Sequence, residues 1–179
     1  MPLLTLDEAK QQLNISGSGQ DVELQAYIDS LTAVIEHLVG PVENRTVTQT
    51  VEGGAVLCLL HTPVVSVESL MPLLPGGVEV DAAAVVVDGP SGVLRRLDGG
   101  RFTGGPWTAV YTAGRGEVPA TVNLAARMLL QHLWRTQNGG RGPVLGGDDM
   151  AAQVPGFGYA IPNRVLELLA PYRLLPGVA

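Results

Sequence analysis

The segment from Asn44 to Ala113 constrains the fold most, because its pattern is that of β-strands while both flanking segments have helical periodicity. Within it, runs of β-branched residues alternate with glycine-containing turns. Strands expose and bury alternate residues, whereas helices bury every third or fourth residue. The chain is therefore predicted to be α+β, with an antiparallel β-module inserted between the second and third helices of a small bundle.

Two helices are predicted before the β-module. Thr5-Leu6-Asp7-Glu8 has the spacing of a capping box, which predicts a short helix from about Leu6 to Leu13. Apolar residues then recur at three-and-four spacing between Leu24 and Leu38, with Asp21 near the start and Gly40-Pro41 as the stop. The second helix has the clearest pattern in the chain.

The β-module is expected to hold five or six strands. The candidates are Thr46–Val51, Val56–Leu60, Val64–Leu70, Val85–Val87, Val93–Arg96 and Trp107–Thr112. Gly53-Gly54 between the first two is typical of a β-hairpin. Arg95 and Arg96 are neighbours on a strand, so they should point to opposite faces and not form one basic patch.

Helical periodicity resumes after Pro119 and continues to about Gln137. Apolar residues cover most of this helix, which is typical of a helix that is buried or shared with a neighbouring subunit. Residues 140–158 have no periodicity and predict a mobile loop or a segment that orders only on binding. A short helix at Asn163–Leu169 and a tail from Tyr172 to Ala179 complete the chain.

These elements predict two domains. Residues 1–43 and 114–179 would form a body of three to four helices with a C-terminal tail, and residues 44–113 would form the β-module. Because the module joins the second helix to the third, the helices must pack together in space while the module projects from them.

Composition disfavours a surface built to bind nucleic acid. The formal net charge is -6 over 179 residues, and Lys10 is the single lysine. The single cysteine, Cys58, cannot form an internal disulfide, and the start of the chain has no basic, apolar signal pattern. Synthesis in the cytoplasm, without a membrane partner, is therefore expected.

No constellation of residues predicts catalysis, a metal site or a cofactor site. Cys58 and His61 have C-x-x-H spacing, but a structural zinc needs four ligands, and His37 and His132 lie far away in sequence. A strand cysteine that faces the core is the expected role of Cys58. Two alternatives stay open: a small hydrolase that uses His61 or His132, and a β-containing module that binds a small ligand.

Three aromatic residues are candidate contacts between subunits, because such residues are enriched at protein interfaces. They are Tyr27, Trp107 and Trp134. For the two tryptophans, burial in the chain's own core is the alternative.

The order and spacing of several segments resemble the bacteriophage head-tail connector, or adaptor, proteins and their gene-transfer-agent and prophage relatives. The segments are Leu4–Leu13, Asp21 with Leu24–Asp29, Ala33–Glu36, Thr62–Leu70, Tyr111–Gly114 and Val118–Ala120. Together they cover most of the chain outside residues 140–158.

The resemblance implies a structural virion protein without catalytic residues or cofactor, located at the head-tail interface. Copies would form a ring, usually of twelve, beneath the portal, with DNA passing through the bore without sequence-specific binding. A stopper or tail-completion protein would bind the opposite side. Portal contact would fall on the C-terminal segment, at Arg164, Tyr172, Arg173, Leu174 and Leu175.

Overall fold

The computed structural model describes residues 2–138 and 161–174, which form two compact units. The helical unit comprises Leu3–Ile35 and Pro119–Pro171. The β unit comprises Glu36–Val118 together with Met1–Pro2 and Tyr172–Ala179. The predicted mixture of helices with antiparallel sheets is confirmed, whereas the domain bounds predicted from the sequence remain a prediction.

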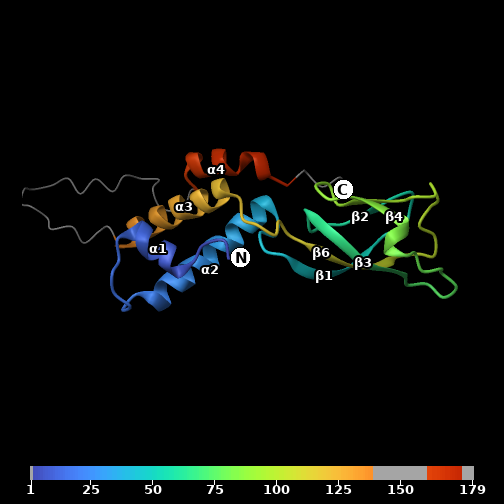
Figure 1. The fold of residues 1–179 in the computed structure, drawn as a ribbon, viewed down its shortest axis with the longest axis horizontal. Helices are drawn as coiled ribbons and strands as arrows, with labels where there is room; N and C mark the ends of the chain where they lie inside the picture. The colour runs from blue at the N-terminus through green and yellow to red at the C-terminus, as the bar shows by residue number, and fades with distance from the viewer. Residues whose placement is uncertain (1, 139–160, 175–179) are drawn as a thin grey trace, which may run out of the picture. The chain divides into compact units, whose positions relative to one another are not determined.

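In the described part of the chain, four α-helices lie close to their predicted positions (Figure 1). They are α1 (Leu6–Leu13), α2 (Asp21–Val39), α3 (Ala120–Asn138) and α4 (Asn163–Leu169). A 3-10 turn, η3 (Ala170–Tyr172), follows α4. The predicted loop at residues 140–158 lies outside the described residues.

Local chemistry accounts for the helix ends. The Thr5 hydroxyl accepts from the Glu8 amide while the Glu8 carboxylate accepts from the Thr5 amide, so the predicted capping box is present. Gly40 follows α2 with φ of 81°, a conformation that glycine adopts at little cost. None of the helices in the described residues has the length and apolar character that a bilayer span requires.

Helix α3 contributes five buried residues to the core of the helical unit and contacts both α1 and α4. Its buried residues are Val122, Ala125, Ala126, Leu129 and Leu130. The alanines let a neighbouring helix approach closely, because their side chains end at Cβ. Leu124, by contrast, is 48% exposed, so the apolar surface of α3 is only partly buried within the unit.

The β unit contains six strands in two antiparallel sheets of three (Figure 1). The strands are β1 (Arg45–Val51), β2 (Leu57–Cys58), β3 (Val64–Pro72), β4 (Val85–Asp88), β5 (Val93–Arg96) and β6 (Trp107–Ala113), and a 3-10 turn, η1 (Ala82–Ala84), precedes β4. The order is β1-β6-β3 in the first sheet and β2-β5-β4 in the second. All six positions match the prediction to within a few residues.

The predicted hairpin between the first two strands is wrong. β1 pairs along its whole length with β6, from Arg45 opposite Ala113 to Val51 opposite Trp107, whereas β2 pairs with β5. Neither Gly53 nor Gly54 has the positive φ that two-residue hairpin turns require. Gly53 instead permits close packing, because a Cβ there would lie 2.6 Å from the Phe102 carbonyl oxygen.

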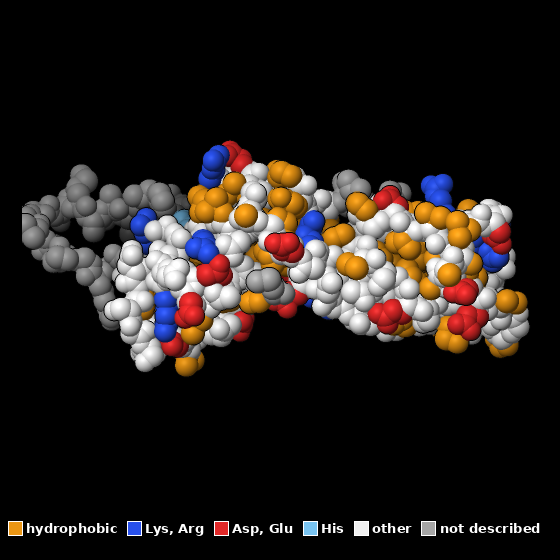
Figure 2. Space-filling model, in the orientation of Figure 1, with side chains coloured by type: hydrophobic (Ala, Val, Ile, Leu, Met, Phe, Trp, Pro, Cys, Tyr) orange, Lys and Arg blue, Asp and Glu red, His pale blue; other side chains and the backbone are white. Residues whose placement is uncertain are grey.

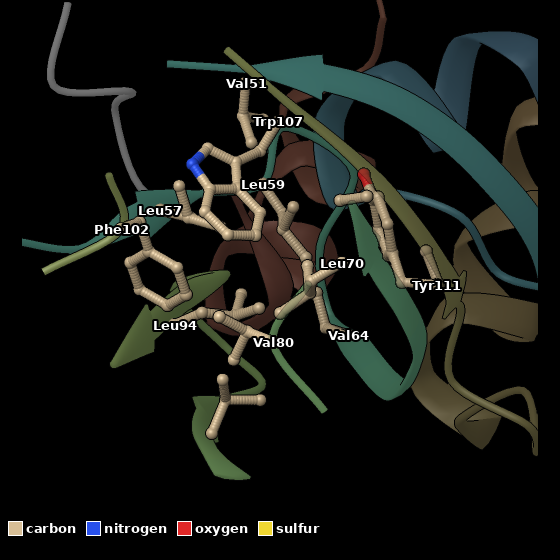
Figure 3. Close-up of a cluster of buried hydrophobic side chains, with 13 residues drawn as sticks. Val51, Leu57, Leu59, Val64, Leu70, Val80, Leu94, Phe102, Trp107 and Tyr111 are labelled. Carbon is tan, nitrogen blue, oxygen red and sulfur yellow. The ribbon is translucent and has the colours of Figure 1, made fainter. Parts of the chain in front are cut away.

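The two sheets pack face to face around one hydrophobic cluster (Figure 3). Trp107 belongs to it, 1% exposed, with the Phe102 ring edge-on at a centroid distance of 5.6 Å. Leu57 and Leu94 reach the cluster from the second sheet. In β6, buried residues alternate regularly with half-buried ones, as expected of a central strand.

The prediction that Cys58 faces the core is also wrong, because its side chain is exposed. Leu57 and Leu59 on either side of it are buried. Since side chains alternate along a strand, burial of the two leucines turns the cysteine outward.

Candidate assembly interface

The end of the described chain is held by the β unit itself. After η3, the Leu174 amide donates a hydrogen bond of 3.0 Å to the Leu38 carbonyl at the end of α2. Helix C-termini carry carbonyl groups without partners inside the helix. The C-terminal segment satisfies one of them.

Arg115 makes the strongest contacts with this segment. Its Nη2 donates to the Val39 carbonyl at 2.8 Å and to the Tyr172 carbonyl at 3.1 Å. The guanidinium carbon also lies 5.3 Å from the centroid of the Tyr172 ring, a cation–π geometry. Arg115 thus joins the C-terminus of α2 to the C-terminal segment.

Burial lowers the pKa of Arg115 from 12.5, and Tyr172 partly opposes this effect. An arginine remains charged even with such a shift. The positive charge therefore lies next to the last carbonyl groups of α2, where the helix dipole favours a cation.

Gly40 provides the room for the C-terminal segment to pass. A Cβ at this position would lie 1.9 Å from the Thr62 carbonyl oxygen and 3.0 Å from Leu174 Cδ2. A larger residue would therefore displace either the Thr62 loop or the segment.

The five predicted portal-contact residues have different environments. Tyr172 and Leu174 are half-buried against the β unit, whereas Arg173 between them is exposed. Arg164, in the helical unit, is exposed and forms an ion pair of 3.2 Å with Glu167. Leu175 lies outside the described residues.

Among the described residues, the two histidines of the open enzyme alternative are not brought together with catalytic partners. His61 is exposed after β2, and its backbone amide donates to the Tyr111 hydroxyl. His132 lines a groove of about 490 Å³ with Met128, Gln131, Arg135, Thr136 and Pro162, a set without a carboxylate. No group of three or more His, Cys, Asp or Glu residues able to hold a metal occurs in the described part of the chain.

Comparison with known families decides the relationship. Residues 2–175 match the head completion protein (HCP) family. The chain belongs to this family. A search of the curated proteins found no match to this chain.

Two solved structures share the fold of this head completion protein. One is a chain from a structure described as the neck of an empty GTA particle computed with C6 symmetry, with 22% identity and a TM-score of 0.67. The other is a chain from the virion of a native gene transfer agent (GTA) particle, with 20% identity and a TM-score of 0.65. Each alignment covers 98% of this chain and 92% of the other.

The aromatic candidates for subunit contacts separate into two groups. Tyr27 and Trp134 of the helical unit pack edge-to-face at 5.6 Å, and the Tyr27 hydroxyl donates to Gln137. Both remain half-buried, so each still has surface to offer. Burial, with a smaller contribution from Glu23, raises the pKa of Tyr27. Trp107 is buried in the β unit and offers no such surface.

Sequence reasoning missed Arg115, which holds the C-terminal segment against the end of α2. The signal is its position between Gly114 and Gly116, whose φ values are 143° and 72°. A Cβ at Gly114 would lie 2.5 Å from the Glu43 carbonyl oxygen. Glycine adopts such positive φ values at little cost, so the two glycines permit the backbone conformation that directs the Arg115 side chain toward Val39 and Tyr172.

Proposed function

We propose that this head completion protein is a structural subunit of the head-tail connector, which forms a ring beneath the portal and joins the capsid to the tail. The observation that carries the proposal is the similarity of fold, over 98% of the chain, to a chain from a gene-transfer-agent neck. A neck lies between head and tail, which is the position that a head-tail connector occupies.

A ring of twelve copies is the proposed assembly. The neck structure was computed with C6 symmetry, and components that obey this symmetry away from the axis occur in multiples of six. Twelve is such a multiple. The net charge of -6 suits a bore through which DNA passes without binding, because repulsion keeps the DNA from adhering.

The C-terminal segment is the proposed portal contact. Arg115 and Leu38 hold Tyr172 and Leu174, which leaves the exposed Arg173 facing outward. A segment fixed at its base loses less conformational entropy on binding than a free tail does. Arg164 and Leu175 are proposed as further contacts with the portal. A stopper or tail-completion protein would bind the opposite side of the ring.

This function requires no chemistry, so the protein is proposed to act without catalysis or cofactor. It would be synthesised in the host cytoplasm and incorporated into the virion at the head-tail interface. Tyr27 and Trp134 are proposed as contacts between neighbouring subunits, since both retain exposed surface in the helical unit.

The test is to mix the purified full-length chain with the portal encoded by the same genome and to image the mixture by negative-stain electron microscopy. We expect a ring of added density on one face of the portal. Arg173→Glu should weaken binding at least tenfold, whereas Arg101→Glu, a matched change at another exposed arginine, should not. Portals without added density would overturn the proposal.

A further inference from the structure

The outer face of the first sheet is rich in hydroxyl groups. Residues opposite each other in an antiparallel pair share a face, and β1 and β6 place Thr46 opposite Thr112 and Thr50 opposite Thr108. We call the outward set of this sheet the threonine face. It comprises Thr46, Thr48, Thr50, Ser66, Glu68, Ser69, Met71, Thr108, Val110 and Thr112, all exposed or half-buried.

Glu68 places a negative charge on the threonine face. It lies at an irregularity in the pairing of β3 with β6, and its Oε1 accepts a hydrogen bond of 2.9 Å from the Thr112 hydroxyl. This bond holds the carboxylate over the outer surface of the sheet.

The outer face of the second sheet is largely apolar. Val86 lies opposite Arg95, and Cys58 lies opposite Val93, while their neighbours Leu57 and Leu94 point into the core. We call this outward set, extended by the residues that follow β2 and β5, the apolar face. It comprises Cys58, Leu60, Val86, Asp88, Val93, Arg95 and Leu97.

The apolar face is unusually exposed for its composition. Leu60 is 74% exposed, Val86 51% and Leu97 64%. Figure 2 shows hydrophobic side chains gathered over the part of the β unit where Figure 1 has β2 and β4. Contiguous exposed apolar residues on a soluble protein mark interaction surfaces.

Arg95 carries the charge that complements Glu68. Its side chain is exposed on the apolar face and forms no ion pair with the described residues. The adjacent Arg96 behaves differently, because it points to the other side and pairs with Asp98. The guanidinium of Arg95 is therefore available to a partner.

We propose that the apolar face of one copy packs against the threonine face of the next copy, with Arg95 of the first facing Glu68 of the second. The two faces lie on opposite sides of one pair of packed sheets, so each copy can contact two neighbours at once. Such a head-to-tail contact generates a ring when its rotation closes. The inference rests on the proposed ring and names the surfaces that build it.

The chemistry of the two faces fits this contact. Threonine methyl groups on a sheet can pack against valine and leucine. Two threonine faces would bring Glu68 residues together, so repulsion of like charges disfavours that symmetric pairing. The apolar face carries Asp88 beside Arg95, and Arg95 is the group on it that can meet Glu68 with opposite charge.

A charge exchange tests the contact in the full-length chain with the portal. Glu68→Arg or Arg95→Glu alone should reduce the copies bound per portal at least fivefold, measured by sedimentation velocity. The double variant should recover wild-type assembly. Glu79→Arg and Arg101→Glu serve as matched controls at exposed positions, and circular dichroism should show every variant folded.

The results separate this inference from the proposed function. Single variants that assemble like the wild type, or a double variant that fails to recover, would overturn the inference while the ring stands. A wild-type chain that does not bind the portal would overturn both.

Cross-linking through the native Cys58 gives a second measurement. In assembled rings, a short bismaleimide should convert Thr48→Cys into a ladder of covalent oligomers, because Cys58 of one copy would meet residue 48 of the next. A link between residues 48 and 58 of the same copy is disfavoured, because the two residues lie on the outer faces of sheets that pack about 10 Å apart. Such a link would have to span both sheets and the side chains between them. Cys58→Ser in the same background should abolish the ladder, and a Cys58–Cys58 dimer in the wild type would overturn the inference.

Discussion

Arg115 shows how one residue can hold a segment of the chain in place. Two carbonyl groups and one aromatic ring from separate parts of the β unit converge on its guanidinium. Because the contacts to Val39 and Tyr172 share one nitrogen, loss of the side chain releases both. The residue therefore acts by positioning the C-terminal segment.

Arg115→Ala should destabilise the protein by about 1–3 kcal/mol, since it leaves the Val39 and Tyr172 carbonyl groups without their charged donor. Urea denaturation measures the loss. Amide exchange of Leu174 should accelerate because its bond to Leu38 would open more often. The exposed Arg101→Ala should change neither quantity, and unchanged exchange in Arg115→Ala would contradict the positioning role.

Glu8 predicts how stability depends on pH. The Thr5 amide foremost, with the Thr5 hydroxyl and Arg127, lowers its pKa below 4.5, against the opposing effect of burial. A carboxylate with a lowered pKa stabilises the fold above its unfolded value, and this stability is lost as pH falls through the folded value. The contribution is therefore complete above about pH 5 and declines below about pH 4.5.

Glu8→Gln should cost about 1 kcal/mol near neutral pH and almost nothing at about pH 3, as measured by urea denaturation across that range. The exposed Glu52→Gln provides the matched control. If the loss of unfolding free energy caused by Glu8→Gln were the same at every pH, the charge of the Glu8 carboxylate would contribute nothing to the capping box with Thr5.

At the scale of elements, local signals predicted the positions of helices and strands, but not how the strands pair. The Thr5–Glu8 box and Gly40-Pro41 act within a few residues, so the sequence reveals them directly. The pairing of β1 with β6 joins residues far apart in the chain, and no short-range pattern encodes it. The hairpin prediction failed for this reason.

The candidate surfaces divide in the same way. Tail positions from Tyr172 to Leu174 followed from the resemblance, and the opposite faces of Arg95 and Arg96 followed from strand alternation. The hydrogen bonds from Arg115 to Val39 and Tyr172 could not be predicted, because these partners lie in α2 and in the C-terminal segment, far from Arg115 in the sequence. Only the folded chain brings these three parts together.

The two tryptophans should differ sharply in their contributions to stability. Trp107→Ala removes the largest buried side chain of the β core and should cost about 3–5 kcal/mol. Trp134→Ala removes a half-buried ring that packs on Tyr27, and should cost about 1 kcal/mol. Denaturant unfolding of both variants measures the difference, and equal costs would contradict the assignment of Trp107 to the core.

At the scale of the whole molecule, the account assigns different tasks to different surfaces. We propose that the C-terminal segment meets the portal, that the two outer faces of the β unit join neighbouring copies, and that Tyr27 and Trp134 add a contact from the helical unit. Each proposed contact uses groups that are exposed or half-buried in the described chain. An assembly protein is expected to keep such surfaces until its partners cover them.

The central claim is that this head completion protein forms the connector between head and tail. Cryo-electron microscopy of particles from the genome that encodes the chain tests it most directly, with and without the gene. The account predicts a ring of this fold directly beneath the portal in complete particles, and separate heads and tails when the gene is deleted. Complete, tailed particles without the gene, or a neck density that the chain does not fit, would contradict the account.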